Sequence, residues 1–187
     1  MNDASKGAIK MELDQLFFGK ITAGKITHQN SGEQALKAAR REVASYLKNG
    51  GVVHYQRDLA EVSTEQFYQT VLIDLLWLER VFGKIIRLKK YNRGSTKSKQ
   101  LFLTIRLENK IIVQYGLNSL AGLAPTFSFD FSSKGFNLDF DDQIQAPIRL
   151  NSTAQVDVRH QSEINETEFQ NLKRIWELLD FELKGDD

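Results

Sequence analysis

Cationic side chains are concentrated in one stretch of the chain, residues 84–110. Nine of the 25 lysines and arginines lie there, against a single acid, Glu108. Long cationic side chains reach phosphate oxygens, and the one tyrosine among them, Tyr91, belongs to a residue type that stacks on nucleic-acid bases. The residue types therefore predict contact with a nucleic acid. The candidate contact residues are Arg87, Lys89, Lys90, Tyr91, Arg93, Lys97, Lys99 and Arg106.

Two other interpretations fit the same cationic stretch. Lysines on an exposed edge strand guard a sheet against edge-to-edge aggregation. The stretch also suits an acidic protein surface, or the chain's own C-terminal third, because residues 127–187 hold six basic and thirteen acidic side chains. A net charge of only +1 conceals this segregation, which creates a surface field that acts on partners. For phosphate contacts we expect binding that falls steeply with salt.

A second motif is a near match to a phosphate-binding loop. Residues 19–26 match the pattern G-x-x-x-x-G-K, but Ile26 stands where a serine or threonine must hold magnesium. The apolar run that ends at Asp74 imitates the metal-ligating acid of such proteins. The context opposes nucleotide hydrolysis, because residues 27–32 are predicted to be loop and Asp74 lies inside a predicted helix. We interpret the match as chance.

No catalytic residue, metal site or cofactor is expected. Glu108-Asn109-Lys110 resembles the end of a metal-dependent nuclease core, but no Asp or Glu occurs from Arg80 to Leu107 to supply the upstream ligand. The three histidines are scattered, and Asp139–Asp142 lacks the glycine and distal glutamate of a calcium loop. The absence of cysteine excludes disulfides, thiol catalysis and thiolate metal sites.

Length and composition are those of one globular domain. The chain has 187 residues, of which 41% are hydrophobic and 26% charged. We divide it into an N-terminal arm, 1–32, with a short helix and a loop, and a single α+β domain, 33–187. No apolar run approaches the ~20 residues of a membrane span, and the N-terminus lacks the apolar core of a signal peptide. We therefore expect a soluble cytoplasmic protein with no membrane partner, and the oligomeric state is left open.

Three helices are predicted from apolar positions three and four residues apart. The second has the strongest signals, because Ser63 and Gln66 fit a capping box and Gly83 is placed to end it. It is apolar around most of its girth, so we expect it to be buried on two sides and central. The ranges are Glu33–Lys48, Thr64–Phe82 and Glu166–Leu183.

Alternation of apolar and polar residues predicts the strands. In residues 101–108, leucine and isoleucine at the odd positions alternate with Phe102 and three polar residues. A loop at 109–111 would place Leu107 opposite Val113 in the next strand and keep the apolar face continuous. Further strands are predicted at 51–56, 147–150 and 154–160.

A phenylalanine-rich segment predicts a second hairpin. Its apolar side chains recur at every second position on both sides of a Ser-Ser-Lys-Gly turn, so all six fall on one face. A turn centred on Ser133 and Lys134 would place Phe131 opposite Phe136. The six residues are Phe127, Phe129, Phe131, Phe136, Leu138 and Phe140.

These elements predict a two-layer α+β fold. A curved antiparallel meander of five or six strands has two helices before it and one long C-terminal helix after it, with the helices on one face. The leading functional hypothesis is a non-enzymatic nucleic-acid-binding or nucleic-acid-associated accessory protein that uses the basic hairpin. One alternative is a protein-interaction module, an adaptor or inhibitor with charge-segregated faces. Another is an apolar ligand pocket under the C-terminal helix, although a closed core explains the same residues. Its lining would be Tyr115, Phe127, Phe129, Leu138 and Trp176.

Overall fold

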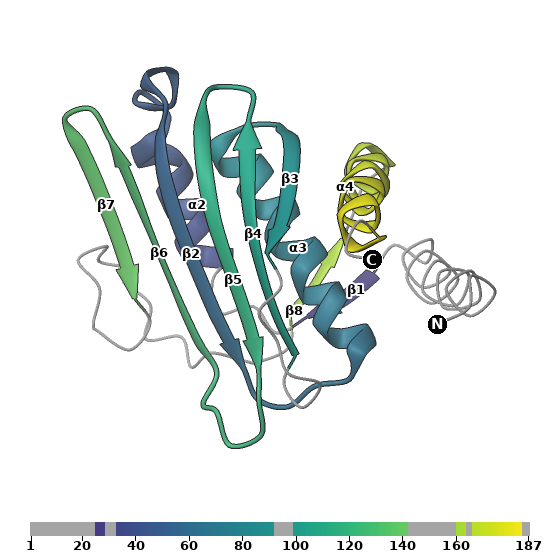
Figure 1. Cartoon of the computed structure of the whole chain (residues 1–187). Coiled ribbons are helices and arrows are strands. Elements are labelled where there is room, and N and C mark those ends of the chain that lie inside the picture. The colour runs from purple at the N-terminus through teal and green to yellow at the C-terminus, as the bar shows by residue number, and fades with distance from the viewer. Residues whose placement is uncertain (1–24, 29–32, 92–98, 142–159, 164–165, 185–187) are drawn as a thin grey trace.

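The computed structural model describes residues 25–28, 33–91, 99–141, 160–163 and 166–184. A six-stranded, mostly antiparallel sheet has helices packed against one face, which confirms the predicted α+β class (Figure 1). The helices of this layer are α2 (Glu33–Val43), α3 (Thr64–Phe82) and α4 (Glu166–Lys184). The strands of the sheet are β2 (Gly51–Leu59), β3 (Ile85–Tyr91), β4 (Lys99–Leu107), β5 (Ile111–Ser119), β6 (Thr126–Ser133) and β7 (Phe136–Asp141).

The strand order is β3-β4-β5-β2-β6-β7, and β2 and β5 are the one parallel pair in this sheet. The sequence predicted a short strand at 51–56, whereas β2 has nine residues and lies in the middle of the sheet. Its insertion divides the predicted meander into β3-β4-β5 and β6-β7. Val53, Tyr55 and Leu59 of β2 are at most 2% exposed. A strand with neighbours on both sides and helices over one face buries its inward side chains in this way.

Helix α3 is formed and capped as the sequence predicts. The Ser63 hydroxyl accepts the Gln66 amide hydrogen and the Gln66 side chain accepts that of Ser63, which completes the capping box. The helix ends at Gly83, whose φ of +117° favours glycine. Twelve of its nineteen residues are buried, so α3 is the central helix, as expected.

The two other helices differ in how closely they follow the prediction. Helix α2 ends at Val43, and a turn and a 3₁₀ helix at Leu47–Asn49 occupy the rest of the predicted range. The 3₁₀ helix stops at Gly50, which has a φ of +71°. Helix α4 has its predicted range to within one residue. Ion pairs of Arg174 with Glu79 and of Arg80 with Glu168 attach α4 to α3.

The register of the first predicted hairpin differs from the prediction by two residues. Ile105 lies opposite Val113, so the loop comprises residues 108–110 and not 109–111. Lys110 adopts a φ of +67°, and its amide donates to the Leu107 carbonyl oxygen. A three-residue loop with a left-handed last residue is a common solution for antiparallel strands. Because side chains alternate, a shift of two residues leaves every side chain on its predicted face.

The second hairpin shows the same kind of shift. Phe131 lies opposite Leu138, where the sequence predicted Phe136, and Ser133 is now the partner of Phe136. The turn therefore consists of Lys134 and Gly135, and Gly135 takes a φ of +78° that glycine adopts without strain. The three β6 phenylalanines are still buried on the helix-covered face, together with Phe140 of β7.

A separate two-stranded sheet joins segments far apart in the chain. Strand β1 (Lys25–His28) pairs antiparallel with β8 (His160–Glu163). Residues 27 and 28, predicted as loop, are thus strand, and Lys25 begins a strand where a phosphate-binding loop would begin a helix. The predicted short helix of the arm lies outside the described residues. So do the edge piece at 147–150 and all but the last residue of the strand at 154–160.

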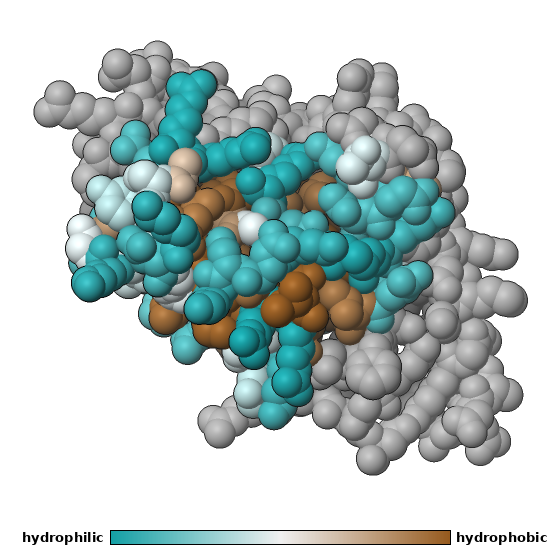
Figure 2. All heavy atoms as spheres, turned by 90° about the horizontal axis from the view of Figure 1, so that it is seen from above, coloured by the Kyte–Doolittle hydropathy of each residue, from teal (hydrophilic) through white to brown (hydrophobic). Residues whose placement is uncertain are grey.

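The core lies between the sheet and the helices. Among the described residues, the exposed large hydrophobic side chains are Ile86, Tyr91 and Phe102. Figure 2 looks down on the end of the sheet that carries the β4–β5 turn, where hydrophilic residues cover most of the described surface and hydrophobic ones show between them. Within the described part of the chain, no helix is long and apolar enough to cross a membrane.

Candidate functional site

The candidate site lies on the face of the sheet that α2, α3 and α4 do not cover, which we call the open face (Figure 1). Side chains alternate along each strand, so residues between the buried ones point to this face. The registers arrange them in rows across the strands. One row is Tyr91, Phe102, Gly116, Gln56 and Ser128. The next is Lys89, Thr104, Gln114, His54, Asp130 and Asp139.

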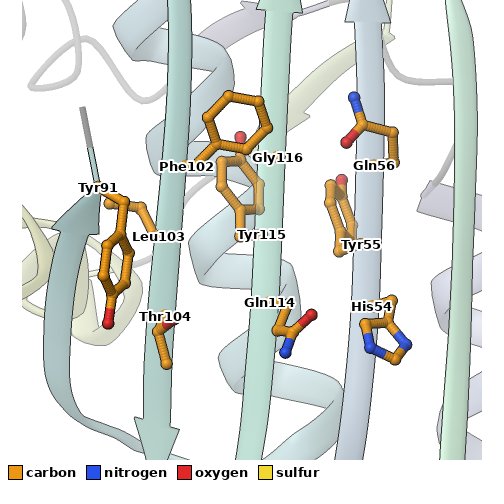
Figure 3. Close-up of a pocket in the computed structure, with 10 residues that line it drawn as sticks. All are labelled: His54, Tyr55, Gln56, Tyr91, Phe102, Leu103, Thr104, Gln114, Tyr115 and Gly116. Carbon is orange, nitrogen blue, oxygen red and sulfur yellow. The ribbon is translucent and has the colours of Figure 1, made fainter. Parts of the chain in front are cut away.

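Two aromatic residues lie on the open face, Tyr91 and Phe102, which we call the aromatic pair, and their rings extend in different directions from the two strands (Figure 3). They are directly opposite each other in the β3–β4 ladder, and they are 49% and 37% exposed. Large aromatic rings are normally buried, and an exposed pair is a surface for stacking. The sequence predicted Tyr91 as a stacking residue and missed Phe102. The signal was present, because the alternation of β4 places Phe102 among polar residues.

Three of the predicted cations lie on the same face, Arg87, Lys89 and Arg106, which we call the cation cluster. All three are exposed. Arg87 is directly opposite Arg106 in the ladder, and Lys89 Nζ lies 5.4 Å from the centre of the Tyr91 ring. Like charges directly opposite each other destabilise a sheet. The cluster and the aromatic pair together form a cationic and aromatic surface on the open face of β3 and β4.

Two of the remaining predicted contact residues, Lys90 and Lys99, are not on this surface. Lys90 is opposite Leu103, which is 2% exposed, so its side chain leaves the sheet on the helix-covered side. Lys99 donates from Nζ to the backbone oxygen of Val62 at 2.5 Å, which ties it to the start of α3. Arg93 and Lys97 lie outside the described residues.

A shallow groove of about 340 Å³ continues the surface toward the middle of the sheet (Figure 3). Gly116 lies between Phe102 and Gln56 in the same row, and both side chains reach over it because it has no side chain of its own. A Cβ at Gly116 would lie 2.3 Å from Gln56 Oε1 and 3.3 Å from the Phe102 ring. The groove is lined by His54, Tyr55, Gln56, Tyr91, Phe102, Leu103, Thr104, Gln114, Tyr115 and Gly116.

A hydrogen-bonded cluster on Asp58 supports the far wall of the groove. Its carboxylate accepts from Gln56 Nε2 at 3.0 Å, Asn118 Nδ2 at 2.8 Å and Thr126 Oγ1 at 3.1 Å. The three donors come from β2, β5 and β6, so the cluster joins three adjacent strands. Side chains held by several partners lose little further conformational freedom when a ligand binds.

The open face changes sign across the sheet. His54 Nδ1 lies 3.0 Å from Asp130, and Asp139 and Asp141 follow on β7. The cation cluster therefore occupies one side of the face and carboxylates the other. The charge segregation of the sequence therefore appears on the open face as two separate regions. The cations lie on β3 and β4, and the carboxylates lie on β6 and β7.

A buried charged network lies on the helix-covered side of β2. The Arg57 guanidinium donates two hydrogen bonds to the Asp74 carboxylate, at 2.9 and 2.8 Å, and one to Tyr55 Oη at 2.9 Å. Tyr115 Oη donates to Asp74 at 3.1 Å. The Arg57 and Asp74 side chains are 3% and 4% exposed. Sequence reasoning placed Asp74 in a helix but did not find this network, because Asp74 lies 17 residues from Arg57 and 41 residues from Tyr115 in the chain.

Burial governs the titration of this network. It raises the pKa of the Tyr55 and Tyr115 hydroxyls well above 10.0; the Asp74 charge adds to this increase, and the Arg57 charge opposes it. Burial by itself would lower the pKa of Arg57, but attraction to Asp74 and Tyr55 outweighs it, and the pKa is raised. Arg57 and Asp74 thus form a charged pair with their hydrogen bonds satisfied and little access to solvent. Such a pair is suited to structure and not to chemistry on a ligand.

The residues of the predicted apolar pocket are packed in the core. Tyr115, Phe127, Phe129 and Trp176 are at most 3% exposed. Ring centres lie 5.8 Å apart for Phe127 and Phe129, and 6.1 Å apart for Trp176 and Tyr68. Leu138 is partly buried against the same core. Contacts of this kind are typical of a closed core.

Among the residues that the structure describes, no group of three or more histidines and carboxylates is placed to hold a metal ion. The chain matches no model of a known protein family, and a search among curated proteins finds no significant relative. The geometry of the open face is therefore the basis for assigning a function.

Proposed function

We propose that this protein is a non-enzymatic, cytoplasmic accessory protein that binds nucleic acid on the β3–β4 part of its open face. The observation that carries the proposal is the aromatic pair, exposed and adjacent, beside the cation cluster on the same two strands. Stacking of a base on an exposed ring contributes about 1–3 kcal/mol. Cations next to such a platform contact the phosphates that join the stacked bases.

Protection of a sheet edge explains less of this surface. Edge protection needs charge on the outermost strand, β3, but Phe102 and Arg106 are on β4, which is paired on both sides. The outer edge of β3 is also contacted by α4, where Arg174 donates to the Ile85 carbonyl oxygen at 2.8 Å. Exposed aromatic rings promote aggregation, so they do not belong to a protective device.

The test is fluorescence anisotropy with short oligonucleotides over a range of salt concentrations. In one variant, Arg87, Lys89 and Arg106 are changed to serine. In a matched control, three exposed cations outside the open face, Arg40, Arg41 and Lys48, are changed to serine. We expect salt-sensitive binding by the native protein and the control, and a slope of log K against log salt lower by about 2 in the first variant.

Stacking is tested separately by Tyr91→Ala combined with Phe102→Ala. We expect binding to weaken by one to two orders of magnitude with little change in the salt slope, because the phosphate contacts are retained. Equal losses in the cation variant and its charge-matched control would show general attraction and not a site. Absence of binding by the native protein at low salt would refute the proposal.

The carboxylates on the opposite side of the face favour a second candidate, a protein-interaction module. Asp139 and Asp141 extend the negative region from Asp130, and such a region attracts a basic protein surface. Changing Asp139 and Asp141 to serine separates the candidates. A module that works through this region loses its partner, whereas nucleic-acid binding stays the same or strengthens as repulsion decreases.

A further inference from the structure

Gln56 is held in one orientation by its neighbour on β2. A carboxylate offers only acceptors, so the Gln56 amide must present its nitrogen to Asp58 Oδ1, 3.0 Å away. Asp58 is itself held by Asn118 and Thr126. The amide oxygen, Oε1, is therefore turned away from Asp58.

The oxygen points toward β5, over Gly116 (Figure 3). It lies 2.3 Å from the position that a Cβ of Gly116 would take, and the Phe102 ring edge is 3.3 Å from the same point. Only a glycine leaves room for the oxygen there. A hydrogen-bond acceptor of fixed direction is thus placed beside the ring of the aromatic pair.

From this arrangement we infer that the groove selects bases with an exocyclic amino group, such as cytosine, over uracil or thymine, in single-stranded nucleic acid. The inference rests on the proposed function. A base stacked on Phe102 brings its edge to Gln56 Oε1, where the cytosine 4-amino group donates a hydrogen bond. Uracil presents a carbonyl oxygen at that position, and two acceptors repel each other. Bases in a duplex are stacked and paired, so they cannot use the platform in this way.

The test compares oligodeoxycytidine and oligodeoxyuridine of equal length at one low salt concentration, by fluorescence anisotropy. These strands carry bases of the same size that differ at the amino edge, which reduces the contribution of stacking to the comparison. We expect the native protein to bind the cytidine strand about fivefold more tightly, the value of one net hydrogen bond. Gln56→Met keeps the length of the side chain and removes the acceptor, so we expect the ratio to fall to about 1.

Two further variants move the acceptor without removing it. Gly116→Ala displaces Gln56 Oε1 and disturbs the one hydrogen bond that Gln56 donates to Asp58, but a side chain and not the backbone moves, so the fold is expected to tolerate it. Asp58→Asn allows the amide to turn over, because an asparagine can donate as well as accept. Both are expected to reduce the preference for cytidine. Gln100→Met is the matched control. It makes the same chemical change on β4, outside the row that contains Gln56, and we expect it to keep the fivefold ratio.

The outcomes separate this inference from the proposed function. If neither strand binds, the proposed function itself is wrong, and the inference falls with it. If both strands bind with equal affinity and steep salt dependence, the proposed function stands and the inference is overturned. A cytidine preference that survives both Gln56→Met and Gly116→Ala would also overturn it. Thermal melting of each variant confirms folding, and Gly116→Ala supplies the answer if Gln56→Met does not fold.

Discussion

Charged groups lie on both faces of the sheet, in opposite circumstances. On the helix-covered side, Arg57 and Asp74 are buried, and each charge is matched by an opposite charge and by tyrosine hydroxyls. On the open face, Arg87 and Arg106 are exposed and face each other as like charges. The buried charges are neutralised within the fold. The positive charges of Arg87 and Arg106 are not neutralised by each other on β3 and β4.

This difference separates residues that hold the fold from residues that face a partner. Removing one member of a buried ion pair strongly destabilises the protein, because the charge of the other member is left uncompensated. Exposed like charges destabilise the sheet slightly while they are present. An external anion would neutralise both charges, and in the proposed function that anion is a nucleic-acid phosphate.

The largest effect is expected from Asp74→Ala. The substitution leaves the Arg57 charge buried without its partner, so we expect the free energy of unfolding to fall by about 3–5 kcal/mol. Urea denaturation measures it. The paired substitution of Arg57→Met with Asp74→Leu should recover most of the loss, because no isolated charge remains. A fall of less than about 1 kcal/mol in Asp74→Ala would contradict the structural role of the network.

Alkaline pH is expected to have the next largest effect, and it acts on the same buried region. Burial raises the pKa of Tyr55 and Tyr115 well above 10.0. At a pH that ionises the tyrosines of the unfolded chain, both therefore stay protonated in the folded protein. The unfolded state then binds fewer protons, and stability falls as the pH rises above about 10, by about 1.4 kcal/mol per pH unit for each tyrosine. Below the unfolded pKa this contribution is fully present.

Urea denaturation at a series of alkaline pH values measures this slope. Tyr115→Phe removes one of the two hydroxyls, so its stability is expected to fall less steeply with pH than that of the native protein. An unchanged slope would show that Tyr115 does not contribute to the alkaline loss.

The smallest effect is expected from Arg106→Thr on the open face. It removes the like charge opposite Arg87 and leaves a residue that β-strands accommodate well, so we expect stability to rise by about 0.2–1 kcal/mol. Nucleic-acid affinity should fall in the same variant, since one phosphate contact is lost. Lower stability together with unchanged affinity would show that Arg106 supports the fold and does not contact a nucleic acid.

The candidate site was only partly predictable from the sequence. Charge composition and residue type pointed to the β3–β4 stretch and to Tyr91. Alternation within a strand assigns side chains to faces, so it also contained the position of Phe102. Alternation did not show that Lys89 lies on the open face and Lys90 on the helix-covered face, because the sequence does not show which side of β3 the helices cover. The tie between Lys99 and Val62 depends on residues 37 positions apart, which no local pattern reports.

By itself, the sequence determined the features that depend on neighbouring residues. These are the type of most elements, the caps of α3 and the face on which each hairpin residue lies. Tertiary structure decided the features that depend on distant residues. Strand β2 lies between β5 and β6, Arg57 meets Asp74, and Gln56 reaches over Gly116. The alternation of side chains does not distinguish between hairpin registers that differ by two residues, and it does not show which strands are neighbours. The turns with Lys110 and Gly135 in the left-handed region set the two hairpin registers, and the packing of the whole sheet against its helices sets the neighbours of β2.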